Sequence, residues 1–204
     1  MRVLIACEFS GIVREAFRKR GHDAVSCDLL PTEVEGPHIQ DDVLLHLDEG
    51  WDLMIAHPPC TYLTCTGNKW FKPEFADRFP NRPKQREDAI KFFLAIGAAN
   101  IPKIAIENPV GIMSTVWRKP DQIIQPYQFG HEARKKTCLW LKGLPPLVPT
   151  KIVGEGESVV FKSGKRMPKW YADLVSLPAK ERELARSRTF SGVADAMANQ
   201  WGSL

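Results

Sequence analysis

A cysteine and a glutamate that each follow a predicted buried strand are the residues best suited to chemistry. Cys60 comes after two prolines that end the apolar run Trp51–Ala56. A backbone of little freedom would therefore hold its thiol in place, as a nucleophile requires. Glu107 follows the apolar run 103–106, where burial is expected to raise its pKa and let it share or donate a proton. Either residue alone could be structural, but together they form a candidate catalytic pair.

A second set of polar residues follows the predicted strands nearest the N-terminus. Residues 8–11 form a turn ending in glycine directly after the first strand, where a nucleoside could lie close to the backbone, although a full G-x-G-x-x-G motif is absent. Asp28 ends the next strand, the place from which an acid can accept ribose hydroxyls. Asp41 and Asp42 follow a third possible strand at residues 38–40, and either could accept a hydrogen bond from an adenine amino group. This arrangement favours a nucleoside pocket.

Helices and strands must position these residues, and the hydrophobic pattern of the chain predicts an α/β fold. An apolar run, an amphipathic segment ended by Gly21 and a second apolar run form a predicted βαβ unit at the N-terminus. Because ligands bind at the carboxyl ends of the strands in open parallel sheets, the candidate residues are expected to meet at that edge. The long polar stretch 61–83 is interpreted as a mobile lid over the edge. The predicted strands are 2–7, 23–29, 38–40, 51–56, 103–106 and 136–141, and the predicted helices are 12–20, 84–99 and 192–201.

Length and composition indicate one folded domain covering residues 1–204. Apolar residues make up 44% of the chain and charged residues 25%, which excludes a disordered chain, a collagen-like chain and a coiled coil. No stretch is long and apolar enough to span a membrane, and no secretion signal is visible. The five cysteines are scattered without a CxxC pair, so neither a disulfide framework nor a zinc knuckle is expected. We expect a cytoplasmic protein with reduced thiols and no metal.

The charge is divided unevenly along the chain. Residues 1–115 carry 13 Lys or Arg and 16 Asp or Glu, whereas residues 116–204 carry 15 and 8, which gives net charges of −3 and +7. Such asymmetry indicates that the second half meets a polyanion. Near its centre, basic side chains stand beside Trp170 and Tyr171, a mixture suited to single strands or a flipped nucleotide. The candidate nucleic-acid-binding residues are Lys162, Lys165, Arg166 and Lys169.

The order of these motifs resembles that of the cytosine carbon-5 DNA methyltransferases, and most closely their compact phage-type relatives. The resemblance rests on Phe9-Ser10-Gly11, Asp28, Asp42-Val43, Pro58-Pro59-Cys60, Glu107-Asn108-Pro109, Glu132-Ala133-Arg134-Lys135-Lys136 and the closing segment 192–201. It covers residues 3–142 and 189–202 and implies a class I methyltransferase-like Rossmann sheet, mostly parallel, with helices on both faces. It further implies S-adenosylmethionine as cofactor and DNA, through a single-stranded or flipped cytosine, as partner.

The resemblance also implies a role for each matching residue. Cys60 would be the nucleophile, Glu107 would hold ring nitrogen 3 and the exocyclic amine of the cytosine, and Arg134 would support the active site. The cofactor pocket would be formed by Glu8, Phe9, Ser10, Gly11, Asp28, Asp42 and Pro58.

The sequence departs from the family's pattern in ways that leave other functions open. The first motif has one glycine instead of two, and Gln-x-Arg-x-Arg appears as Glu132-x-Arg134-x-Lys136. Residues 151–190 leave room only for a reduced substrate-recognition insertion. The alternatives are the same chemistry on a cytidine nucleotide or on RNA, a non-catalytic nucleic-acid-binding relative, and a cysteine hydrolase that uses His57 as its base.

Overall fold

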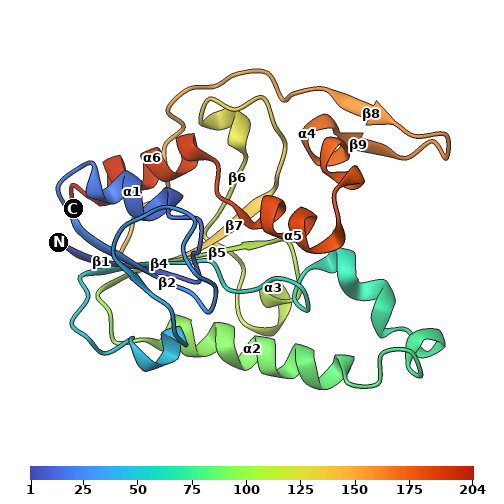
Figure 1. The fold of residues 1–204 in the computed structure, drawn as a ribbon, viewed down its shortest axis with the longest axis horizontal. Coiled ribbons are helices and arrows are strands. Elements are labelled where there is room, and N and C mark those ends of the chain that lie inside the picture. The colour runs from blue at the N-terminus through green and yellow to red at the C-terminus, as the bar shows by residue number, and fades with distance from the viewer.

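A seven-stranded sheet forms the centre of the computed structural model, which describes residues 1–204 (Figure 1). The strand order is β3-β2-β1-β4-β5-β7-β6, and β3, β2, β1, β4 and β5 run parallel. β7 is antiparallel to both of its neighbours. The predicted α/β class with a mostly parallel sheet is therefore confirmed. The strands of this sheet are β1 (Arg2–Ala6), β2 (Asp23–Cys27), β3 (His38–Ile39), β4 (Leu53–Ala56), β5 (Lys103–Pro109), β6 (Gln122–Ile124) and β7 (Thr137–Lys142).

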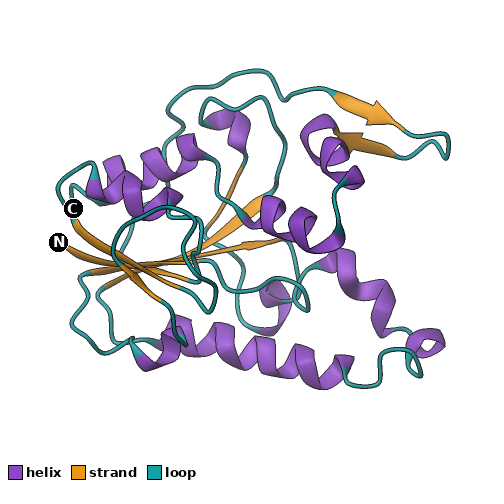
Figure 2. Ribbon diagram, viewed as in Figure 1, coloured by secondary structure: helices purple, strands orange, loops and turns teal.

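Helices cover both faces of the sheet, as expected (Figure 2). On one face, α1 (Ile12–Arg18) and α6 (Ser191–Trp201) pack together over a core that includes Phe17 and the fully buried Trp201. On the other face, α2 (Arg82–Ala98) covers a second core that contains Phe93 and Trp140. Since β4 is buried along its whole length, its continuous apolar sequence fits a central strand with both faces covered.

Glu107 lies within a strand, although the apolar run predicted that the strand ends at residue 106. β5 continues to Pro109 because β7 pairs with its last residues from the side opposite β4. Glu107 stands opposite Leu139, and Asn108 stands opposite Cys138. Pro109 is the last residue of this strand, as the sequence predicted, and the partner strand stiffens the backbone that carries Glu107.

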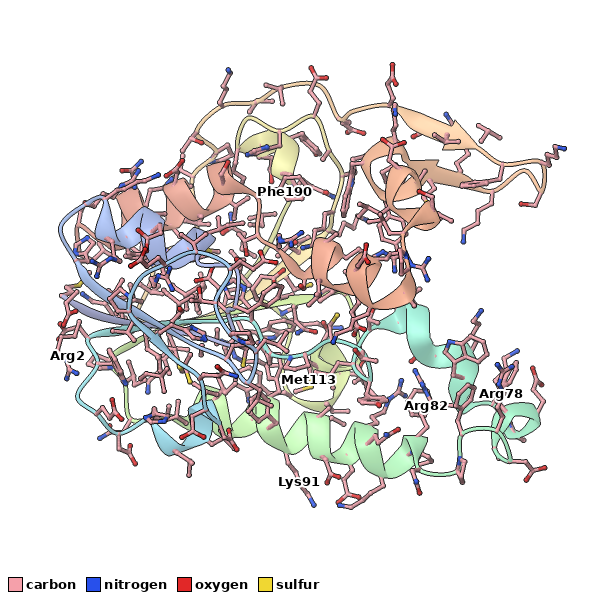
Figure 3. The ribbon with its side chains drawn as sticks, in the orientation of Figure 1. Arg2, Arg78, Arg82, Lys91, Met113 and Phe190 are labelled. Atoms are coloured by element: carbon pink, nitrogen blue, oxygen red, sulfur yellow. The ribbon has the colours of Figure 1, made fainter.

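The segment that follows Cys60 has more structure than a polar loop. It forms two 3₁₀ helices, Cys65–Phe71 and Pro73–Phe75, before α2 begins. Trp70 packs edge-on against Phe75 and Phe79, with ring centroids 5.0 and 5.4 Å apart. Figure 3 labels Arg78, which lies in this segment, and Arg82, the first residue of α2. The segment thus has a small aromatic core of its own, and its mobility stays a prediction.

Residues 151–190, which have weak hydrophobic periodicity, form short elements beyond the sheet. The hairpin β8 (Ser158–Val160) and β9 (Arg166–Pro168) extends away from the main body, next to α4 (Lys169–Asp173) (Figure 1). The short α3 (Met113–Val116) follows β5, and α5 (Ala179–Ser187) leads back toward the sheet. None of the helices is long and apolar enough to cross a membrane.

Candidate active site

The ends of three adjacent strands and the segment before α6 enclose a cavity of about 110 Å³. Cys60 and Glu107 both line it, so the candidate catalytic pair is brought together. The turn after β1 lines the same cavity. Its walls are formed by Cys7, Glu8, Phe9, Ser10, His57, Pro58, Pro59, Cys60, Glu107, Asn108, Pro109, Lys135, Arg186, Ser187, Arg188 and Thr189.

Buried polar contacts fix the turn between β1 and α1. The Glu8 carboxylate accepts hydrogen bonds from the backbone N–H groups of Val13 and Arg14, at 2.7 and 3.1 Å, and from the Ser10 hydroxyl at 3.1 Å. A carboxylate at this place also offsets the positive end of the helix dipole. Glu8 therefore shapes the turn by capping α1, and most of its hydrogen-bonding capacity is already used within the protein.

Gly11 is required by the packing of this turn. Its φ of 71° is in the left-handed region, and a Cβ atom there would lie 2.8 Å from Nη2 of Arg14. The Arg14 side chain is completely buried and donates to the Ser26 hydroxyl and to the Val34 carbonyl. The buried Arg14 side chain thus excludes a side chain at Gly11, and the approach of a nucleoside to this backbone stays a prediction.

Two hydrogen bonds, one from β5 and one from the segment after it, hold the backbone before and after Cys60. The buried Asn108 donates from Nδ2 to the Pro58 carbonyl at 2.7 Å, so β5 fixes the two prolines before the cysteine. After the cysteine, the Ile112 N–H donates to the Leu63 carbonyl at 2.8 Å. A Cβ atom at Gly111 would lie 2.1 Å from that carbonyl oxygen, so only glycine allows this approach. Cys60 is therefore held from both sides, as a directed nucleophile requires.

Glu107 has a lowered pKa, which corrects the expectation from the sequence. Burial alone would raise it, but the hydrogen bond with His57 and the positive charge of Lys135 outweigh burial. Nδ1 of His57 lies 3.4 Å from Oε2 of Glu107. Glu107 is accordingly a carboxylate at neutral pH, and sequence reasoning overlooked the two neighbours that keep it ionised.

The pKa of Cys60 is raised, whereas that of Glu107 is lowered. Burial of Cys60 and the negative charge of Glu107 raise its pKa, while Lys135 acts to lower it. Lys135 also donates from Nζ to the Arg186 carbonyl at 3.0 Å and to the Arg188 carbonyl at 3.4 Å. This lysine therefore links the thiol, the carboxylate and the segment before α6. Its place in the basic run 134–136 was the available signal, but the sequence favoured Arg134.

The raised pKa gives a testable order of cysteine reactivity. A raised pKa means a smaller thiolate fraction at any given pH, and the thiolate is the reactive form. At pH 7 we expect iodoacetamide to modify the exposed Cys65 before Cys60. The rate at Cys60 should increase with pH, and Lys135→Met should slow it further because a stabilising charge is lost. Peptide mass spectrometry at timed intervals measures both rates, and faster modification of Cys60 at neutral pH would contradict this assignment.

Besides Gly11, three of the predicted catalytic and cofactor-binding residues do not line the cavity. Arg134 contacts the Ser158 hydroxyl and lies 3.5 Å from the Glu155 carboxylate, on the side of the β8–β9 hairpin. Asp42 is exposed and caps a 3₁₀ helix by accepting from the Leu44 N–H at 3.0 Å. Asp28 is half-buried just after β2, where burial raises its pKa, and one of its oxygens accepts from the Leu30 N–H. Of the three, Asp28 keeps a partly buried carboxylate at the carboxyl edge.

The segment Arg186–Thr189 closes the cavity and was not singled out from the sequence. Arg188 forms a two-pronged ion pair with Glu33, in the loop after β2, with N–O distances of 2.9 and 2.5 Å. Lys135 holds the same segment from the other side. Sites for drug-sized ligands measure roughly 300–1,000 Å³. The cavity is smaller than this and is partly open to solvent.

The basic side chains proposed to bind nucleic acid lie on the hairpin and on α4. Lys162, Lys165 and Arg166 are exposed, whereas Lys169 pairs with Asp173 at 2.9 Å. The neighbouring aromatic rings, however, already make contacts within the protein. The stacking of bases on these rings stays a prediction. Trp170 packs on Tyr171 and Phe190 and donates to the Arg134 carbonyl. The Arg186 guanidinium lies 3.8 Å from the Tyr171 ring centroid.

Comparison with known proteins yields a structural match. No protein-family model and no curated protein matches the chain. A similar solved structure is that of a candidate DNA modification methyltransferase encoded within a prophage, from E. coli, with a TM-score of 0.49 and 14% sequence identity. The match covers 76% of this chain and 52% of that one, so this chain spans about half the length of that protein.

Proposed function

We propose that this protein transfers a methyl group from S-adenosylmethionine to carbon 5 of cytosine in DNA, through a covalent adduct at Cys60. The observation that carries the proposal is the shared cavity of Cys60, Glu107 and Lys135, next to the turn after β1. Carbon 5 of cytosine is a poor nucleophile, and addition of a thiolate at carbon 6 converts the ring into an enamine. A fixed cysteine beside a carboxylate supports this chemistry.

Cys60, Lys135 and Glu107 each have a separate role in the proposed reaction. Cys60 loses its proton, with Lys135 favouring the thiolate, and its sulfur forms a bond to carbon 6. The electrons of the 5,6 double bond move toward ring nitrogen 3, where Glu107 accepts the hydrogen bond of the exocyclic amine and shares a proton with the ring nitrogen. The proton lost by the thiol balances the proton gained by the ring. Loss of the carbon-5 proton then allows the sulfur to leave and the double bond to form again.

The residues at the carboxyl ends of β1 and β2 suit the proposed cofactor. When bound, S-adenosylmethionine supplies the methyl group from its sulfonium. The turn at residues 8–10 offers a rigid backbone, and the half-buried Asp28 has an oxygen beyond its single backbone contact for ribose hydroxyls. This fit supports the proposal from residues that the catalytic pair does not use.

Asp28 gives a direct test of this pocket. Asp28→Ala should weaken the binding of S-adenosylhomocysteine by roughly 1.5–3 kcal/mol, the usual contribution of hydrogen bonds to a charged group. Asp48→Ala, at an exposed position that does not line the cavity, serves as a control. Isothermal titration calorimetry measures both affinities. An unchanged affinity for Asp28→Ala would remove this residue from the proposed pocket.

The choice of substrate is tested by incubation with labelled S-adenosylmethionine. Duplex DNA, single-stranded DNA, RNA and cytidine nucleotides are compared, and the incorporation of the labelled methyl group into each substrate is measured. We expect transfer to DNA, with single-stranded or easily opened sites preferred, because opening a duplex costs a few kcal/mol per flipped base. Transfer to free nucleotides or RNA would favour the alternative substrates, and binding without transfer would favour a non-catalytic relative.

One observation bears on the cysteine-hydrolase alternative. Such an enzyme needs an imidazole nitrogen hydrogen-bonded to the thiol. Nδ1 of His57 faces Glu107, and its Nε2 has no hydrogen-bond partner, so neither nitrogen contacts Cys60. The arrangement therefore supports methyl transfer over hydrolysis.

The excess positive charge of residues 116–204 predicts a salt-dependent affinity for polynucleotides. If phosphates neutralise four of these side chains, the log–log slope of affinity against salt should be about −3 to −4. Lys165→Glu with Arg166→Glu should weaken binding of a fluorescent single-stranded DNA and leave cofactor affinity unchanged. Lys91→Glu, on α2 and paired with Glu87, is the matched control (Figure 3). A flat salt response in fluorescence anisotropy would show that this surface does not bind phosphates.

A further inference from the structure

His57, which lines the cavity, lies between the turn after β1 and Glu107 on β5. His57 directly follows β4, the strand between β1 and β5, and its side chain is 8% exposed. Nδ1 lies 3.4 Å from Oε2 of Glu107. Nε2 is buried and has no hydrogen-bond partner. A buried imidazole with one nitrogen unpartnered is costly, so a contribution beyond packing is indicated.

The contact with Glu107 has a defined direction. An ionised carboxylate only accepts hydrogen bonds, so Nδ1 of His57 carries the proton in this contact. At 3.4 Å the contact is long, and hydrogen bonds of this kind often shorten when a substrate binds. Oε2 of Glu107 is thereby engaged by the protein, which leaves the other carboxylate oxygen for a ligand.

Among the other groups around Glu107, the Thr137 hydroxyl at the start of β7 also acts to lower its pKa, but less than His57 does. Lys135 precedes β7 and contributes charge, but its ammonium donates to the carbonyls of Arg186 and Arg188. Cys60 after β4 and Cys138 on β7 feel the negative charge of Glu107, which acts to raise the pKa of both thiols. On the cofactor side, the charge of His57 acts to lower the pKa of Asp28. His57 is thus placed to act on Glu107 through a directed hydrogen bond.

We propose that His57 is a positioning residue, which fixes one carboxylate oxygen of Glu107 so that the other faces the edge of the target base. The inference rests on the proposed function and deepens it, since it concerns how the same site recognises a ring with an exocyclic amine beside a ring nitrogen. A carboxylate free to rotate would meet that edge in many orientations. A misplacement of about 1 Å at a reacting group can lower a rate about a hundredfold.

The test compares two substitutions of His57 by a measurement that needs no turnover. His57→Leu removes the donor, and His57→Asn keeps an N–H near the position of Nδ1. Carbon-13 NMR of labelled glutamate, with Glu107→Gln to assign the signal, follows the titration of Glu107. Because the hydrogen bond and the charge of His57 both lower this pKa, we expect it to rise in His57→Leu and to rise less in His57→Asn, which keeps an N–H but no charge. Equal pKa values in His57→Leu and wild type would overturn the inference.

A second measurement connects the residue to the reaction. The rate of covalent adduct formation with DNA that contains 5-fluorocytosine should fall about a hundredfold in His57→Leu and recover in His57→Asn. Thermal unfolding of each variant identifies any loss of fold, and the asparagine variant keeps the inference testable if the leucine variant does not fold. If the wild type forms no adduct while the NMR shifts follow the expected order, the proposed function fails and the positioning of Glu107 stands.

Discussion

Replacement of Cys60 by alanine is expected to abolish the covalent complex with DNA that contains 5-fluorocytosine. Fluorine at carbon 5 blocks the final elimination, so the wild-type protein should remain attached to the DNA during denaturing electrophoresis. Without the sulfur of Cys60 no bond to carbon 6 forms, and the attached species should be absent. This is the largest effect expected from any single substitution in the chain.

The neighbouring cysteine provides the matched control. Cys65 is exposed, in the 3₁₀ helix that follows Cys60 in the chain, and does not line the cavity. Cys65→Ala should therefore form the complex as the wild type does. An adduct that persists in Cys60→Ala, or that maps to Cys65 in peptide mass spectrometry, would refute the role of Cys60.

Replacement of Glu107 by glutamine is expected to slow formation of the same complex by roughly 10²–10⁴-fold, the usual contribution of a positioned acid or base. An amide of the same shape cannot share a proton with ring nitrogen 3, so negative charge that develops on the ring is no longer neutralised. The rate is measured from timed samples on denaturing gels. Glu74→Gln, on an exposed turn of the segment after Cys60, is the control and should react at the wild-type rate.

The interpretation of Glu107→Gln depends on the thiol, because the negative charge of Glu107 raises the pKa of Cys60. Removal of this charge lowers that pKa and increases the thiolate fraction at neutral pH. Iodoacetamide should then modify Cys60 faster in Glu107→Gln, while addition to cytosine becomes slower. This opposite response separates loss of proton sharing from a general disturbance of the site. A wild-type rate of adduct formation in this variant would exclude Glu107 from the reaction.

The sequence by itself determined the main elements of the sheet and the residues that meet at its edge. The apolar runs of β1, β2, β4 and β7 and the amphipathic helices α1, α2 and α6 agree with prediction to within a few residues. These segments are buried on one or both sides, so their hydrophobic patterns are strong. Cys60 and Glu107 follow from the same logic, because adjacent parallel strands present their ends at one edge.

The short elements were decided by tertiary contacts. β6 has three residues and pairs with β7, and β8 and β9 pair only with each other. A run of three residues is too short for a period of two or of 3.6 to appear. The backbone partner, and not the local sequence, determines such strands. The same applies to the last residues of β5, which stay extended because β7 lies beside them.

The charge state of Glu107 also depends on the tertiary structure. Glu107 follows an apolar run, and burial alone predicts a raised pKa. Its pKa is lowered because the fold brings His57 from the end of β4 and Lys135 from the segment before β7 to the same carboxylate. The segment Arg186–Thr189, far along the chain, then closes the cavity through Lys135 and Glu33. A sequence pattern reports the environment of one segment, whereas the charge state of a buried group depends on every segment that packs against it.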